Sequence, residues 1–263
     1  GIIALNGASP IIRNNLFINV IEGVSSLGGS SPIIQNNIIR TKGDANIGID
    51  LLEGSSAMIT NNVIDSEGPA PWGWGIYIDS SYANIKNNIF TNLPIAINNP
   101  FSSTISFSYN DFWNVQYEYR NGAYYGPANG VGDKQVNPLF SDSDFHLQDS
   151  SQCIDSGDSS SQYNDIYFPP SKGTIRNEMG AYGGHYTKLE NSPSILTSVK
   201  TSSFFVKEGE AVTFTSTSDD LDEDIIRLVC GTSSETSDLC TGSYSASNPS
   251  CSFVFPSQEN GIK

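Results

Sequence analysis

Basic residues are scarce in this 263-residue chain. It carries 13 Lys and Arg against 28 Asp and Glu, which gives a net charge of −15. Nucleic-acid phosphates require basic patches on their protein partners, so this balance argues against a nucleic-acid partner. It also disfavours an acidic polysaccharide as ligand unless cations intervene.

Long apolar runs are also missing. No apolar stretch approaches the length of a membrane span, so we expect no membrane-spanning segment in this chain. The first residues do not read as a signal peptide, because Gly1 leads directly into a strand-like run. We therefore interpret the chain as a processed or trimmed piece of a longer precursor.

The residues of several common catalytic and metal sites are few or absent. The chain has two His and four Cys, with no Cys-x-x-Cys pair, which argues against a zinc site. It contains no nucleophile elbow and no Ser/His/Asp pattern. Three Cys near the C-terminus predict one disulfide in a small extracellular domain, with the pairing open: Cys230, Cys240 and Cys251. We accordingly expect a secreted or cell-surface protein.

What the chain does contain is an internal repeat. A phrase that first reads Ser-Pro-Ile-Ile-Arg-Asn-Asn-Leu-Phe, at residues 9–17, recurs through the first half of the chain. Its second Asn is separated from the next by 22, 25, 26 and 22 residues, and the five positions are Asn15, Asn37, Asn62, Asn88 and Asn110. A period in the twenties indicates a solenoid.

The phrase favours a parallel β-helix among solenoids. It is too short for a helix pair, lacks the Leu pattern of leucine-rich repeats, and suits a strand, a bend and a second strand. Asn tolerates left-handed backbone angles at a bend, and stacked Asn side chains can form a hydrogen-bonded ladder. Further segments, such as 47–52, 75–79 and 94–98, alternate as strands with one face in the core. A β-sandwich with Asn-rich turns is the alternative, and the regular period argues against it.

A tail with its own motifs follows the repeats. The motifs are Asn137-Pro-Leu-Phe, Asp144-Phe-His-Leu, Ile154-Asp-Ser-Gly-Asp and Met179-Gly-Ala-Tyr. Together with the Asn-Asn repeats, they resemble secreted right-handed parallel β-helix repeat proteins of the surfaces of bacteria and archaea. The resemblance covers residues 1–184 and implies a β-helix over 1–135 with a closing tail over 136–189. The family includes surface proteins, adhesins and polysaccharide-active enzymes.

The C-terminal part has a different composition. We interpret residues 190–203 as a linker, and residues 204–263 resemble the opening of an immunoglobulin-like or PKD-type module. A β-sandwich of this kind needs nearer 100 residues, so the module is expected to be incomplete. A longer native chain, a neighbouring module or another copy of the protein would supply the missing strands.

Aromatic residues are the candidates for carbohydrate contact. Residues 65–74 form an insertion into one turn, and insertions in solenoids often lie on the binding face. Exposed rings can stack on sugars; the alternative is that they pack over the side and end of the coil. The candidates are Trp72, Trp74, Tyr77, Trp113, Tyr117 and Tyr119.

Acidic loops are the candidates for a metal, with calcium as the expected ion. Calcium prefers carboxylate oxygens, and a solvated acidic turn is the alternative interpretation. The first cluster is Asp219, Asp220, Asp222 and Asp224; a second is Asp142, Asp144, Asp155 and Asp158.

These observations favour a structural or adhesive surface protein, such as a subunit of a surface layer or filament, with a glycan as a candidate partner. The alternative is a β-helix polysaccharide lyase or glycoside hydrolase. The resemblance implies a Lys or Arg base for a lyase, and Arg13 and Lys86 occupy equivalent positions of different turns. A hydrolase needs two carboxylates, and Asp50 and Asp79 are expected on neighbouring turns.

Overall fold

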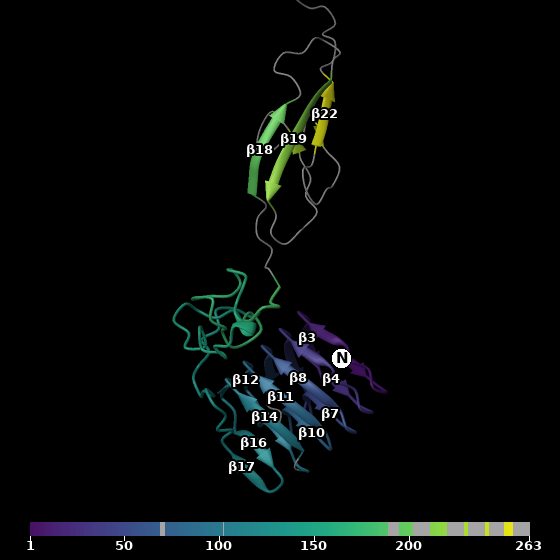
Figure 1. The fold of residues 1–263 in the computed structure, drawn as a ribbon, viewed down its shortest axis with the longest axis vertical. Coiled ribbons are helices and arrows are strands. Elements are labelled where there is room, and N and C mark those ends of the chain that lie inside the picture. The colour runs from purple at the N-terminus through teal and green to yellow at the C-terminus, as the bar shows by residue number, and fades with distance from the viewer. Residues whose placement is uncertain are drawn as a thin grey trace, which may run out of the picture. The chain divides into compact units, whose positions relative to one another are not determined.

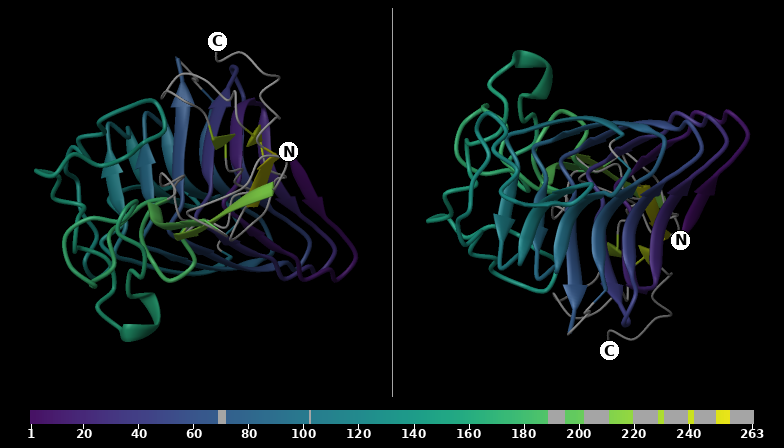
Figure 2. Two further views of the ribbon diagram at one scale, coloured as in Figure 1. Left: turned by 90° about the horizontal axis from the view of Figure 1, so that it is seen from above. Right: turned by 90° about the horizontal axis from the view of Figure 1, so that it is seen from below.

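The computed structural model describes residues 1–68, 72–101 and 103–188, together with the backbone of five strands between residues 195 and 254. The chain divides into two compact units, Gly1–Lys188 and Leu189–Lys263. In the first unit the chain winds into a coil of parallel strands, with successive turns side by side (Figures 1 and 2). The predicted parallel β-helix is therefore confirmed, and a β-sandwich over the repeat region is wrong.

Each turn of the coil contributes one strand to each of three sheets. Sheet A contains β1(Ile2–Ala4), β4(Glu22–Ser26), β7(Ile47–Leu51), β10(Trp74–Ile78), β13(Ile95–Asn99) and β16(Tyr117–Asn121), with β17(Tyr124–Gly126) antiparallel at its edge. Sheet B contains β2(Ile11–Arg13), β5(Ile33–Gln35), β8(Ser56–Thr60), β11(Tyr82–Lys86) and β14(Thr104–Ser108). Sheet C contains β3(Leu16–Val20), β6(Ile38–Lys42), β9(Val63–Glu67), β12(Ile89–Thr91) and β15(Asp111–Trp113). These strands make five full turns, and β16 begins a sixth.

Stacked apolar side chains fill the interior of the coil. Ile49, Ile76 and Ile97 follow one another in sheet A and are fully buried. Sheets B and C contribute matching columns, in which the fully buried members are Ile34, Ile59, Ile85, Ile39, Ile64 and Phe90. The alternation expected for residues 47–52 and 75–79 is thus confirmed, whereas β13, which covers most of 94–98, is buried throughout and Ile95 lies outside the core cluster. Because each turn repeats the same pattern, like residues pack on like along the axis.

The Asn pairs form the corner between sheets B and C. The first Asn of each pair has a left-handed backbone, with φ of 53° at Asn61 and 57° at Asn87. The second Asn points inward and donates from Nδ2 to Oδ1 of the Asn on the next turn, over distances of 2.9 to 3.0 Å from Asn15 to Asn110. The expected ladder is confirmed, and it ends where the Asn110 backbone N–H donates to Asp133.

Three glycines near the start of the sheet A strands allow neighbouring turns to approach closely. At Gly48, an added Cβ would lie 2.5 Å from the carbonyl oxygen of Gly75 and 2.7 Å from Ile64 Cγ2. Gly23 and Gly75 are equally close to the backbone of the following turn. A side chain at these positions would therefore push neighbouring turns apart.

The tail lies along the side of the coil. Phe145, Leu147 and Met179 pack on the outward-facing Ile38 and Val63 of sheet C. The first Asn residues of the pairs hold the tail as well: Asn36 Nδ2 donates to the carbonyls of Ala181 and Gly183, and Asn61 Nδ2 to that of Glu178. The end of the coil is covered separately, by a segment in which Ala128 joins the core and Val131 bridges to Ser108.

The second unit contains antiparallel strands. β18(Ile195–Thr201), β19(Ala211–Asp219) and β22(Ser250–Val254) form one sheet, and β20(Val229–Cys230) pairs with β21(Cys240–Thr241). β18 lies within the segment interpreted as a linker. The immunoglobulin-like module stays a prediction.

Candidate functional site

The outer face of sheet A brings together polar and aromatic side chains from successive turns. The strand register aligns Asp50, Tyr77, Asn98 and Arg120 in one column across β7, β10, β13 and β16. Side chains alternate along a strand, and both neighbours of Tyr77 are buried in the core, so this column faces outward. A second column in the same sheet runs through Glu22, Ile47, Trp74, Ile95 and Tyr117.

Aromatic rings line this face. The rings of Trp74 and Tyr77 are stacked, with centroids 4.9 Å apart and an interplanar angle of 25°. Two turns further on, Tyr117 meets Tyr125 edge to face at 5.2 Å. The Arg120 guanidinium lies 5.0 Å from the centroid of the Tyr125 ring. Flat apolar surfaces thus recur at intervals along the coil.

Two carboxylates, Asp50 and Asp79, border Tyr77, and a third, Glu22, lies near Asp50. Burial, followed by the negative charges of Glu22 and Asp79, raises the pKa of Asp50 from 3.8 to about 6. Burial, Asp79 and Asp50 likewise raise the pKa of the Tyr77 hydroxyl. Like charges held close together disfavour ionisation, so Asp50 retains its proton in mildly acidic solution. A protonated carboxyl can donate a hydrogen bond as well as accept one.

Two buried polar atoms lie on either side of Tyr77. Asp50 Oδ1 and Asn98 Nδ2 have no hydrogen-bond partner among the described residues. Asn98 is fully buried, and its Oδ1 accepts a long bond of 3.4 Å from Arg120. Buried polar atoms are nearly always paired in folded proteins, so these two are exceptions, and a side-chain rotation would be needed to bring them to a ligand or to water.

The six aromatic residues predicted to contact carbohydrate lie on different parts of the coil. Trp74, Tyr77 and Tyr117 share the outer face of sheet A, and Trp72, just before β10, is 70% exposed. Trp113 ends β15 in sheet C. Tyr119 instead contacts Phe107 at 5.2 Å and packs against the end of the core, as the packing alternative expected.

The basic residues considered for a lyase lie elsewhere. Arg13 and Lys86 both lie in sheet B, but each contacts the tail. Lys86 Nζ is 2.6 Å from Asp158 Oδ2, and the Arg13 guanidinium is 5.5 Å from the Tyr186 ring. Both side chains therefore attach the tail to the coil, and the face that carries Asp50 has Arg120 as a basic neighbour instead.

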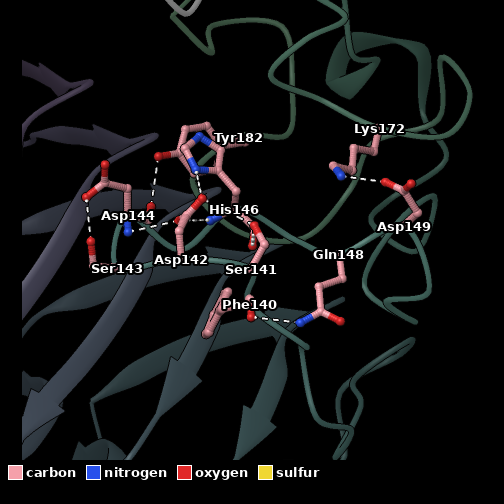
Figure 3. A network of polar contacts seen from close by, with 10 residues as sticks. All are labelled: Phe140, Ser141, Asp142, Ser143, Asp144, His146, Gln148, Asp149, Lys172 and Tyr182. Carbon is pink, nitrogen blue, oxygen red and sulfur yellow. Dashed lines mark hydrogen bonds and ion pairs between the residues drawn. The ribbon is translucent and has the colours of Figure 1, made fainter.

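The second predicted acidic cluster is dispersed among separate partners. Asp142 Oδ2 is 2.8 Å from His146 Nδ1, and the His146 ring stacks on Tyr182 at 4.0 Å (Figure 3). Burial opposes ionisation of Asp142, but hydrogen bonds from His146 and its charge outweigh it and lower the pKa. The Tyr182 hydroxyl donates to the Asp144 carbonyl, whereas the Asp155 carboxylate accepts from Thr174. Among the described residues, no group of three or more His, Cys, Asp or Glu is placed to hold a metal.

The remaining candidates fall in the second unit. Asp220, Asp222 and Asp224 lie outside the described residues, and Asp219 is described only as the last backbone position of β19. Strand pairing places Cys230 opposite Cys240, and Cys251 opposite Phe214. The calcium site and the disulfide stay predictions.

Sequence reasoning missed the partners of the aromatic residues on sheet A. Glu22, Asn98, Arg120 and Tyr125 were not singled out, although their contacts define the face. Aligning the sheet A strands on Gly23, Gly48 and Gly75 would have found Glu22. In β13 and β16 the equivalent residues are Ala96 and Glu118, so Asn98 and Arg120 emerge only from the strand register. Tyr125 lies beyond the repeat, on the antiparallel strand β17.

Comparison with known proteins agrees with the architecture. The search of curated proteins and that of solved structures gave no match. In the part of the chain that the structure describes, no helix is long and apolar enough to cross a membrane. Residues 1–145 match the family model described as the right handed beta helix region, which spans more than half of the chain, and the protein therefore belongs to this family.

Proposed function

We propose that this chain is an extracellular surface protein that contacts a neutral glycan through the outer face of sheet A. The observation that carries the proposal is the stacked Trp74–Tyr77 pair beside the Asp50 carboxyl. A sugar ring has apolar faces that pack on aromatic rings and hydroxyl groups that bond to carboxylates and amides. The half-buried carboxyls of Asp50 and Asp79 are the polar groups beside the rings.

The charge of the chain selects among glycans. With a net charge of −15 and three carboxylates on this face, an acidic polysaccharide would be repelled. A structural or adhesive role requires no reaction, and the coil would present the face as part of a surface layer or filament. Neighbouring modules or further copies would continue the assembly, and calcium bound near Asp219–Asp224 would stabilise the second unit.

Affinity electrophoresis of the full chain through gels that contain neutral polysaccharides tests this proposal. We expect a β-linked glucan, mannan or xylan to retard the chain, and Tyr117→Ala to weaken that retardation several-fold. Tyr82→Ala is the matched control, because Tyr82 lies in sheet B with a similar exposure of 41% against 36%. Equal behaviour of the two variants, or no retardation by any neutral polysaccharide, would refute the proposal.

A glycoside hydrolase is the second candidate, favoured by the raised pKa of Asp50. Such enzymes keep one carboxyl protonated as the acid while another remains ionised, and Asp79 is the neighbouring carboxylate. Incubation with the same polysaccharides, followed by assay of new reducing ends, tests this activity. Release of reducing ends that is lost in Asp50→Asn but kept in Asp44→Asn would establish a hydrolase. If no polysaccharide yields new reducing ends, glycan binding without hydrolysis remains the proposal.

A further inference from the structure

The corner between sheets C and A contains an open trough of about 960 Å³. Its lining comes from four consecutive turns of the coil, from Arg40 in β6 to Gln116 just before β16. Successive turns stack about 4.8 Å apart, so the trough runs along the coil axis over a length of roughly 14 Å. This shape fits a segment of an extended chain rather than a compact small molecule.

A ladder of polar side chains lines the trough along its length. Arg40 Nε donates to Asp65 Oδ2 at 2.8 Å, and Asn92 Nδ2 donates to Asp65 Oδ1 at 2.7 Å. Asn114 Nδ2 then donates to Asn92 Oδ1 at 2.7 Å. Each turn contributes one member, so the ladder repeats at the spacing of the turns.

The hydrogen bonds of this ladder orient its side chains but leave some of their N–H donors unused. A guanidinium has five N–H donors, and within the described residues the Arg40 group uses only Nε in hydrogen bonding. The tail also holds the guanidinium in place, because Arg40 Cζ lies 4.4 Å from the centroid of the Phe145 ring. Each amide nitrogen of Asn92 and Asn114 carries two N–H groups and donates one to the ladder. Donors therefore remain at regular intervals for a ligand.

Apolar groups line the trough beside the ladder. Leu93, Pro94 and Val115 contribute to its surface. The charges in the trough are also compensated, because Asp65 pairs with Arg40 and Glu67 pairs with Lys42 at 3.3 Å. A ligand that matches this surface is uncharged, has hydroxyl groups along its edges and apolar patches on its faces, and repeats at about the spacing of the turns.

We propose that the trough holds an extended neutral glycan strand, with successive sugar residues aligned to successive turns of the coil. A hexose in an extended chain is comparable in length to the rise of one turn. The trough also adjoins the aromatic face, because the Tyr117 backbone N–H donates to the Pro94 carbonyl at 2.9 Å. The inference rests on the proposed glycan contact. It adds a second binding surface, along which the glycan runs parallel to the coil axis.

Calorimetric titration of the full chain with neutral β-linked oligosaccharides tests the inference. We expect the affinity to rise from disaccharide to tetrasaccharide, because the longer chain spans more turns. The variant Asn114→Gly with Gln116→Ala removes exposed polar groups of the trough, and Gly suits the φ of 52° at position 114. Loss of two hydrogen bonds predicts affinity for the tetrasaccharide that is roughly tenfold weaker.

The control variant combines Asn6→Gly with Gln162→Ala. Asn6 is exposed, has a φ of 56° and lies at the corner between sheets A and B, and Gln162 is exposed in the tail. The control is expected to bind as the parent does. If the trough variant binds unchanged while Tyr117→Ala loses affinity, the trough is excluded and the sheet A face stands. If no neutral oligosaccharide binds the parent chain, both proposals fail.

Discussion

Asn62 and Asn88 are joined through one carbonyl oxygen. Asn88 Oδ1 accepts from both the backbone N–H and the Nδ2 of Asn62, each at 2.9 Å. Asn62 Oδ1 likewise accepts from the backbone N–H and the Nδ2 of Asn37, each at 3.0 Å. One buried amide per turn therefore satisfies its own donors and those of the preceding turn, and this relationship holds the coil in register.

Asn62→Ala is expected to destabilise the first unit strongly. The change removes the acceptor for two buried donors of Asn37, and an unsatisfied buried donor costs about 1–3 kcal/mol. We expect the free energy of unfolding to fall by roughly 2–4 kcal/mol in urea denaturation followed by circular dichroism. Asn84→Ala is the control: Asn84 Oδ1 has no partner among the described residues, so its loss should cost far less. Equal losses in the two variants would contradict the role of the ladder.

Gly48→Ala tests the close approach of neighbouring turns at the start of the sheet A strands. A Cβ at this position would lie 2.5 Å from the Gly75 carbonyl oxygen, a contact that only movement of the backbone can relieve. Gly7→Ala is the comparison, because Gly7 has a φ of +76° but open space around it. That change should cost about 1 kcal/mol from backbone strain alone. A thermal midpoint for Gly48→Ala that is not clearly lower than that for Gly7→Ala would show that position 48 tolerates a side chain.

The buried carboxyls of the tail predict a pH-dependent stability. Burial, together with the charge of Asp165, raises the pKa of Glu178 from 4.5 to about 8, and burial raises that of Asp165 from 3.8 to about 7. Between about pH 4.5 and 8 the folded protein therefore binds more protons than the unfolded chain does. The free energy of unfolding should fall as pH rises through this window.

Thermal unfolding at pH 5, 6, 7 and 8 would measure this dependence, with a midpoint that decreases as pH rises. Glu178→Gln keeps an acceptor for the Lys172 backbone N–H but cannot ionise, so the decrease should become shallower. Glu67→Gln, which alters an exposed ion pair, is expected to leave the slope unchanged. A midpoint that rises with pH in the parent protein would contradict the raised pKa values.

The strand pairing of the second unit predicts one specific disulfide. Cys230 and Cys240 are opposite each other in adjacent antiparallel strands, at a separation of backbones that a disulfide can span. We expect peptide mapping of the unreduced protein to find Cys230 linked to Cys240 and Cys251 unlinked to either. A link from Cys251 to one of them would refute this pairing.

Much of the coil could be predicted because its determinants are local and repeat along the chain. The Asn pairs identify the corner at Asn61 and Asn87, since their left-handed backbone suits few other residues. The inward columns follow from alternation in each strand, as at Ile76 and Ile78. The direction of the tail could not be predicted, because it depends on apolar residues of sheet C, such as Ile38 and Val63, that face outward.

The site depends on contacts that spacing along the chain does not reveal. Turns differ in length, so the residues that meet Tyr77 are known only once the strand register aligns Asp50 and Asn98 with it. Arg13 and Lys86 share a sheet as expected, but residues of the distant tail reach them and use their charges for attachment.

The sequence by itself therefore determined the repeat, the buried ladder and the stacked core, because each follows from side-chain chemistry at a fixed offset within one turn. Only the tertiary structure decided which outward side chains of different turns meet, how their charges shift one another, and which of them the tail covers. These properties arise from distances between segments that are far apart in the chain, and such distances are set by the stacking of the turns.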